Sequence, residues 1–283
     1  MKHIGSIFLS CFILISFSRN LVRLPVVIPN KCDTIIDLSS EEMLPSHTIV
    51  YGVNILDSLD FRLQSRMTSK DYYSGSFLKD EKFMSDSIKV FVDTTHVNFH
   101  LGEQSVISHF PPPPPPQTDN KRDSIYFKEI YDRAILEHEN RGRTHYKTYP
   151  LFVYNSSRRS TVIQRPMFND LFFIVEALDS LKIWRPIEYW EQRTVLCGTG
   201  HRDYLLKPKH FIVSAVKRYH GDFKTKLRVR FTSFNKVFFS NEYEGWMNYS
   251  QFDTTKLKRE IRKQFGKAKM EYYLKRSFLS PTY

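Results

Sequence analysis

Cys197 and His201 are the residues whose types and spacing come nearest to a catalytic pair. A cysteine becomes a nucleophile when a histidine takes its proton and a third group orients that histidine. Asp203 could be the third group, but residues so close in sequence rarely reach this geometry, and a loop beside a buried cysteine accounts for the same run. We therefore expect a protein without catalytic activity and keep a cysteine-dependent hydrolase of the cell envelope as an alternative.

Metal-dependent and sugar-cleaving chemistry find little support. His96 and His100 would share one face of a strand, but four residues of strand separate them by about 13 Å, too far for one metal ion. Glu188 and Glu191 lie near tryptophans, as carboxylates do in glycosidases, but such neighbours are also common by chance. No His-Glu-x-x-His, Cys-x-x-Cys or Gly-x-Ser-x-Gly motif occurs. We expect no bound metal and no cofactor.

Four aromatic residues are candidates for contact with a ligand or partner: Trp184, Tyr189, Trp190 and Trp246. Large flat side chains with a polar edge are common in binding sites. They are also common in protein cores, so we expect at least two of the four to be buried instead.

The cysteines give a second prediction that depends on the compartment. Cys11 lies in the N-terminal apolar run, which leaves Cys32 and Cys197 in a processed chain. In an oxidising compartment these two could form a disulfide that closes a long loop. The alternative is that both are small buried apolar residues.

The N-terminus has the pattern of an export signal. A short basic start is followed by an uncharged apolar run over residues 4–17, and Ser16 and Ser18 offer small residues at a cleavage site after residue 18. The run is shorter than the roughly twenty residues of a membrane span. An uncleaved anchor or lipidation at Cys11 remain alternatives. We expect residues 1–18 to be a signal peptide and the protein to be periplasmic or on the cell surface, with association to the membrane left open.

The chain carries 42 Lys and Arg against 30 Asp and Glu, a formal charge of +12. From Asp253 onward there are nine basic and three acidic residues, so half of the excess lies in residues 253–283. This segment reads as an amphipathic helix with an apolar stripe, formed by Leu257, Ile261, Phe265, Ala268 and Tyr272. The helix could lie on an anionic membrane, contact nucleic acid, or pack its stripe on the rest of the protein; we favour packing.

A proline run and changes in composition divide the remaining chain into segments. Six prolines at residues 111–116 must form a stiff polyproline II segment, which makes residues 111–122 a spacer. Residues 19–110 before it hold short β-branched runs typical of strands. Residues 123–252 after it begin with a helix to about residue 139 and continue as a β-sandwich domain.

The sandwich is predicted from seven short apolar runs separated by turn residues. Lys224 to Phe231 alternate between basic and apolar residues, which indicates a half-buried strand with a basic outer face. The predicted strands cover residues 149–154, 161–164, 171–177, 185–190, 211–216, 224–231 and 236–240. The fold class is therefore mainly β, with a short helix before the sandwich and an amphipathic helix after it.

Part of this region resembles a group of uncharacterised exported bacterial proteins. The resemblance is carried by Trp184-Arg185-Pro186-Ile187-Glu188-Tyr189-Trp190, Cys197-Gly198, Leu206-Lys207-Pro208 and the run from Tyr219 to Arg228, and covers about a hundred residues. It implies an immunoglobulin-like sandwich. It implies no activity and no site residue.

The function expected from the sequence is that of a non-catalytic, exported envelope protein with a binding or structural role. Its partner would be another envelope protein, a glycan or an anionic membrane surface, whereas export argues against nucleic acid. Besides the cysteine hydrolase, a membrane-anchored assembly subunit is an alternative, and it would retain residues 4–17.

Overall fold

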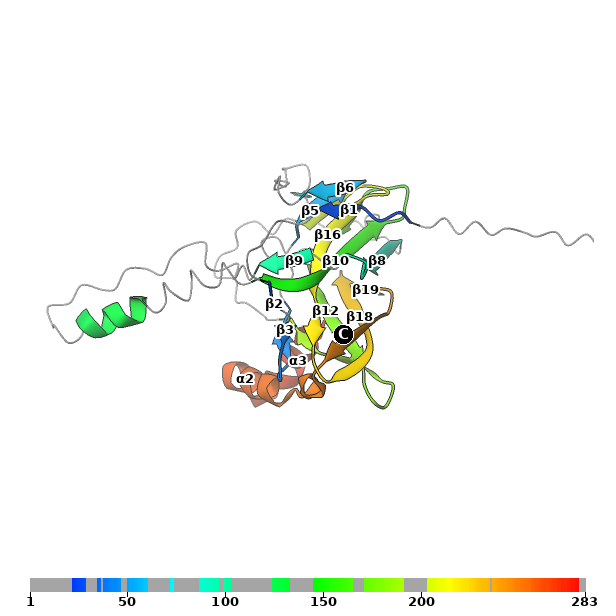
Figure 1. Cartoon of the computed structure of the whole chain (residues 1–283). Helices are drawn as coiled ribbons and strands as arrows, with labels where there is room; N and C mark the ends of the chain where they lie inside the picture. Colours follow the sequence, from blue (N-terminus) through cyan, green and yellow to red (C-terminus); the bar gives the residue numbers. More distant parts are fainter. Residues whose placement is uncertain are drawn as a thin grey trace, which may run out of the picture.

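In the computed structural model the chain is built mainly from strands, with a few short helices (Figure 1). The structure describes residues 22–28, 35–36, 38–46, 50–60, 72–73, 87–96, 99–102, 124–132, 145–164, 171–190, 203–234 and 236–279. The predicted β-rich class is confirmed. The predicted helix before the sandwich is seen over residues 124–132, and its expected continuation lies outside the described residues, as do the proline run and residues 1–18. None of the helices in the described ranges is long and apolar enough to cross a membrane.

A six-stranded sheet is organised around the two long strands β10 and β16. They pair antiparallel from Thr148 and Lys217 at one end to Tyr154 and Phe211 at the other, and the sheet is visibly curled along β10 (Figure 1). Strand β8 pairs with β10 on the side away from β16, since both strands pair with the same residues of β10; β9 also pairs with β10, and β2 and β5 complete the sheet. The members are β2 (Ile35–Ile36), β5 (Gly52–Ile55), β8 (Ile88–Val92), β9 (Phe99–Gly102), β10 (His145–Asn155) and β16 (Phe211–Lys217).

Strands β10 and β16 are apolar on both faces because both faces are covered. Leu151 and Val153 of β10 point into the main core, whereas Phe152 points to the opposite side. That opposite side is covered by Val27 of β1 and Leu59 of β6, from a parallel pair near the start of the chain. Burial on both faces explains why β16 reads as an almost continuous apolar run.

A five-stranded sheet is organised around β18, the strand predicted from its alternating basic and apolar residues. Strand β12 pairs along one edge of β18, and β19 and β20 share the other edge. Leu227, Val229 and Phe231 are buried while the basic residues between them face outward, which confirms the predicted alternation. The members are β12 (Phe173–Leu178), β13 (Trp184–Pro186), β18 (Phe223–Ser233), β19 (Lys236–Phe239) and β20 (Tyr243–Met247).

The two sheets share one hydrophobic core. Leu151 and Ile212 of the six-stranded sheet belong to the same buried cluster as Val175, Val229 and Phe231 of the five-stranded sheet. Val90 of β8 belongs to this cluster as well, so strands from before and after residues 111–122 contribute to one core.

Short strands from the first hundred residues also pair with strands from the later part of the chain and form small separate sheets. Strand β3 pairs with β17, β4 with β14, and β7 with β15, which in turn pairs with β11. Their bounds, with those of the β1–β6 pair, are β1 (Val26–Ile28), β3 (Leu38–Ser39), β4 (Leu44–Pro45), β6 (Ser58–Asp60), β7 (Tyr72–Tyr73), β11 (Thr161–Ile163), β14 (Glu188–Tyr189), β15 (Asp203–Leu206) and β17 (Tyr219–His220).

All seven strands predicted within residues 147–252 are present, with shifted ends. The one predicted at residues 185–190 is divided, because Ile187 separates β13 from β14. Strands β15, β17 and β20 were not expected from the sequence; they are short and are held by pairing with β11, β3 and β18 respectively.

The C-terminal segment is a broken helix rather than the single helix expected. A 3-10 turn, η5 (Tyr249–Phe252), leads into α2 (Thr255–Phe265), and after η6 (Lys267–Lys269) the chain continues as α3 (Met270–Ser277). Gly266 ends α2 with φ +81°, a conformation that favours glycine.

The break changes which residues form the apolar stripe. Leu257 and Ile261 are buried, and Phe265 stacks on Tyr273 of α3 with ring centroids 3.7 Å apart. Packing of the stripe on the protein is thus confirmed for α2, where it also contacts Met43. Ala268 and Tyr272 are exposed, so that part of the predicted stripe is wrong. Because the helix is interrupted at Gly266, the residues of α3 that face the protein do not continue the spacing of the apolar residues of α2.

Candidate ligand-binding pocket

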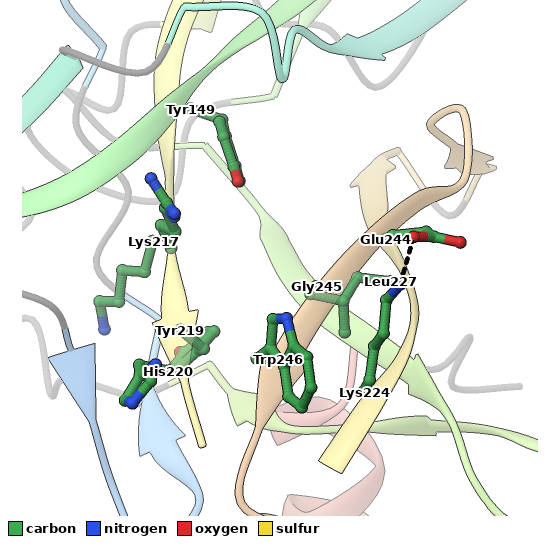
Figure 2. A pocket seen from close by; sticks show the side chains of 10 residues that line it. Tyr149, Lys217, Tyr219, His220, Lys224, Leu227, Glu244, Gly245 and Trp246 are labelled. Carbon is green, nitrogen blue, oxygen red and sulfur yellow. Dashed lines mark ion pairs between the residues drawn. The ribbon is translucent and has the colours of Figure 1, made fainter. Parts of the chain in front are cut away.

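An open pocket of about 330 Å³ lies where the end of β16 meets the β18–β20 pair (Figure 2). Its walls come from five strands and the segment that joins two of them. Its lining residues are Tyr149, Lys217, Arg218, Tyr219, His220, Lys224, Leu227, Glu244, Gly245 and Trp246. A concave site with a few convergent polar groups is the usual form of a small-molecule site.

A tight turn at Gly221 positions two walls of the pocket. A Cβ at Gly221 would lie 2.1 Å from the carbonyl carbon of Met247 and 2.3 Å from the backbone nitrogen of Asn248. Only glycine therefore lets the turn after β17 approach the end of β20 this closely. In the view of Figure 2 the indole of Trp246 stands between His220 of β17 and Lys224 of β18.

The pocket carries more positive than negative charge. Its lining holds three permanent cations, Lys217, Arg218 and Lys224, against one carboxylate, Glu244. Lys224 and Glu244 form an ion pair of 2.9 Å, and the Lys217 ammonium donates to the carbonyl oxygen of Pro45 at 2.8 Å. The Arg218 guanidinium lies 6.0 Å from the centre of the Tyr149 ring, a cation–π distance, and has no acidic partner among the described residues.

The floor of the pocket is held by a buried carboxylate. The Tyr219 hydroxyl donates to Oε1 of Glu188 at 2.5 Å, and the backbone N–H of Val175 donates to Oε2 at 3.1 Å. Burial, followed by the charge of Glu188, raises the pKa of the Tyr219 hydroxyl well above its ordinary value of 10.0. Tyr219 therefore stays neutral at physiological pH and anchors β17 without acting as a base.

A second tyrosine lies behind this floor. Tyr243 packs edge-on against Tyr149, with ring centroids 5.8 Å apart. Its hydroxyl is buried without a hydrogen-bond partner in the described part of the chain. Burial and the charge of Glu188 also raise the pKa of this hydroxyl well above 10.0.

Of the four aromatic contact candidates, the structure brings Trp246 into the pocket. Its side chain is 48% exposed. Trp184 covers the Arg228 guanidinium at 4.2 Å, and Trp190 packs edge-on against Phe172 with centroids 5.2 Å apart. Tyr189 packs against the C-terminal helices. These three are partly buried and serve packing within the protein.

Most of the lining was not foreseen from the sequence. Tyr149 lies on β10, whereas Arg218 and His220 belong to the run that ends β16 and forms β17, about seventy residues later, and no motif links the two segments. Residues 220–222 lie between the predicted strands 211–216 and 224–231, but the contact of this turn with Met247 was not expected. Strand pairing over long separations creates this pocket.

The cysteine chemistry considered above cannot be placed. Cys32, Cys197 and His201 lie outside the described residues, so neither the possible disulfide nor the alternative of a cysteine nucleophile is tested. Among the residues that the structure does describe, no three His, Cys, Asp or Glu side chains gather as metal ligands.

Comparisons with known proteins add no family. No protein-family model, curated protein or solved structure matches the chain. The resemblance to exported bacterial proteins therefore remains a prediction from sequence, and function rests on the geometry of the pocket.

Proposed function

We propose that this chain is a non-catalytic, exported envelope protein that binds an acidic sugar in the pocket beside Trp246. The observation that carries the proposal is an exposed indole in the same pocket as Arg218, a cation without an acidic partner in the described structure. A flat aromatic surface packs on the apolar face of a sugar ring, and a guanidinium binds a carboxylate through two parallel hydrogen bonds. The pocket volume suits one or two sugar rings.

A binding role is favoured over sugar cleavage by the positions of the carboxylates. Hydrolysis of a glycosidic bond requires two carboxyl groups flanking that bond. Glu244 is exposed and paired with Lys224, and Glu188 is sealed beneath Tyr219. Neither is presented to the pocket as a free acid, so the described lining supports recognition.

Export and an immunoglobulin-like arrangement belong to the same proposal. The signal-like residues 1–18 support export, and a core shared by two sheets supports a sandwich. The alternatives make different predictions. A membrane-anchored assembly subunit retains residues 4–17, and a cysteine-dependent hydrolase loses its activity in Cys197→Ala.

Isothermal titration of the full chain with tetragalacturonate, and with neutral maltotetraose as comparison, tests the pocket. We expect binding of the acidic sugar alone, weakened about tenfold in Trp246→Ala or Arg218→Gln. Tyr272→Ala is the matched control, because Tyr272 is 49% exposed and lies on α3, outside the pocket. Equal binding of both sugars, no binding of either, or unchanged binding in Trp246→Ala would overturn the proposal.

Export is tested by the intact mass and cell fraction of the native protein. A mass lacking residues 1–18 in the envelope fraction supports it. Full length in the membrane favours the anchored subunit, and full length in the cytoplasm overturns export.

A further inference from the structure

The α2–α3 hairpin presents a basic surface whose charges are not balanced within the described protein. Lys256 of this hairpin pairs with Glu42, and Lys275 pairs with Glu271. Seven other cations are exposed and form no ion pair with any residue that the structure describes, and one of them, Arg276, lies 5.7 Å from the centre of the Tyr272 ring. The remaining six are Lys258, Arg259, Arg262, Lys263, Lys267 and Lys269. We call these six the basic helical surface; Glu260 is the one acidic side chain within their span.

A rigid turn between β12 and β13 exposes two large aliphatic side chains. Leu181 is 76% exposed and Ile183 is 56% exposed, with Lys182 exposed between them. The turn is not loose, because the buried carboxylate of Asp179 accepts hydrogen bonds of 2.9 Å from the backbone N–H groups of both aliphatic residues. Single exposed aliphatic residues are ordinary, but an adjacent pair held outward by a fixed turn marks an interaction site.

Direct contacts join the turn to the start of the helices. The hydroxyls of Ser180 and Tyr249 are hydrogen-bonded at 2.9 Å, and the Arg185 guanidinium lies 5.7 Å from the centre of the Phe252 ring. Tyr249 and Phe252 belong to η5, which leads directly into α2. Figure 1 accordingly shows the helices and the yellow-green turn after β12 at the same, lower end of the molecule.

We propose that this end of the protein docks on an anionic lipid bilayer. Leu181 and Ile183 enter the interfacial layer, and the basic helical surface contacts the headgroups. Apolar insertion combined with basic residues is the usual means by which a peripheral protein binds such a membrane. The apolar stripe of α2 is already packed inside the protein, so the helices lie on the bilayer and the turn supplies the insertion.

A bilayer fits these observations better than a soluble polyanion. A polyanion such as nucleic acid would bind the cations, but it offers no apolar layer for Leu181 and Ile183. Binding to a bilayer therefore requires Leu181 and Ile183, whereas binding to a soluble polyanion does not. The proposal does not depend on sugar binding, since neither the pair nor the basic helical surface lines the pocket.

Cosedimentation of the full chain with vesicles tests the proposal. One set contains phosphatidylcholine alone, and the other contains equal parts phosphatidylcholine and phosphatidylglycerol. Any contribution of residues 4–17 is common to all variants, so the ratio of the two bound fractions is the readout. We expect Arg262→Gln/Lys263→Gln/Lys267→Gln to lower that ratio about tenfold, and Leu181→Ser/Ile183→Ser to lower the affinity for the anionic vesicles about tenfold relative to the unaltered chain.

Matched controls change the same kinds of residue elsewhere. Leu56→Ser removes an aliphatic side chain that is 52% exposed near β5 and β6, at the other end of the molecule (Figure 1). Lys89→Gln/Arg158→Gln/Lys207→Gln removes three exposed charges outside the basic helical surface. We expect both controls to bind as the unaltered chain does.

Three results would overturn the proposal. One is equal binding to neutral and anionic vesicles. Another is unchanged binding in either Leu181→Ser/Ile183→Ser or the triple helix variant. The third is binding of duplex DNA without vesicle binding, lost in the triple variant and retained in the aliphatic variant, which would assign the surface to polyanions. Circular dichroism of each variant confirms that the fold is intact.

Discussion

The outer face of β18 and the basic helical surface are both rows of lysine and arginine, yet only β18 balances its charge. Each of its four cations has a carboxylate on the neighbouring β12 or in the β19–β20 segment. The pairs are Lys224–Glu244 at 2.9 Å, Lys226–Glu242 at 2.9 Å, Arg228–Glu176 at 2.8 Å and Arg230–Glu176 at 2.9 Å. The basic helical surface has no such pair among the described residues.

Burial separates the two surfaces as well. Glu176 is 1% exposed, and the Arg228 guanidinium lies between the rings of Trp184 and Phe239, at 4.2 and 4.0 Å from their centres. Charges held this way stabilise the sheet, because the carboxylate and its arginines satisfy one another away from water. The helix cations remain in solvent and are available to a partner. A row of basic residues in the sequence can therefore be neutralised by carboxylates within the fold, as on β18, or stay in solvent and be available to a partner, as on the helices.

The largest effect is expected where the charge balance of β18 is broken from within. Glu176→Gln keeps the shape of the side chain but leaves Arg228 and Arg230 without a counter-charge in a partly buried site. We expect the free energy of unfolding to fall by about 3 kcal/mol, measured by urea denaturation. Glu242→Gln is the control, since its pair with Lys226 is exposed. Similar midpoints for the two variants would contradict this account.

The second buried carboxylate, Glu188, is balanced by hydrogen bonds rather than arginines. Tyr219→Phe removes the shorter of them and is expected to cost about 2 kcal/mol of unfolding free energy.

The same hydroxyl predicts a dependence on alkaline pH. Because the folded state raises the pKa of Tyr219 above its ordinary 10.0, the stability it contributes is fully present below pH 10.0 and is lost as pH rises through the folded value. Urea midpoints measured on both sides of pH 10.0 should fall less steeply in Tyr219→Phe. An equal slope in the two proteins would contradict the role of this hydroxyl.

A smaller effect is expected when the charge on β18 is kept and its shape is changed. Lysine is a compact cation that cannot fill the planar space between Trp184 and Phe239 or bind Glu176 through two nitrogens. Arg228→Lys should lower the free energy of unfolding by about 1 kcal/mol. If charge alone mattered, this variant would denature at the same urea concentration as the original chain.

The smallest effect is expected on the basic helical surface. Arg262→Gln/Lys263→Gln removes two cations that have no acidic partner in the described structure, so no folded-state ion pair is lost. We expect the midpoint of urea unfolding to fall only slightly, because the two cations lie in the last turn of α2 and lose a weak interaction with the helix dipole. A clear decrease would mean that these charges stabilise the fold, and the contrast with β18 would fail.

The parts of the fold that the sequence predicted are those with a regular side-chain period. The alternation from Lys224 to Phe231 indicated β18, and the spacing of Leu257, Ile261 and Phe265 indicated α2. Strand β20 was missed because five residues containing Gly245 show no such period; it exists through pairing with β18. Of the pocket residues, Trp246 alone was named as a candidate from the sequence. The others show no local pattern, because the lining comes from strands up to about a hundred residues apart.

Local residue spacing was enough to predict the β-rich class, the half-buried face of β18 and the position of the basic C-terminal segment, because it decides which side of a strand or helix is apolar. Which basic residues meet a carboxylate depends instead on contacts between segments far apart in the chain. Arg228 and Arg230 find Glu176 more than fifty residues earlier in the chain, through the register of β12 on β18. The cations of α2 face solvent because the opposite side of the helix is the one that packs.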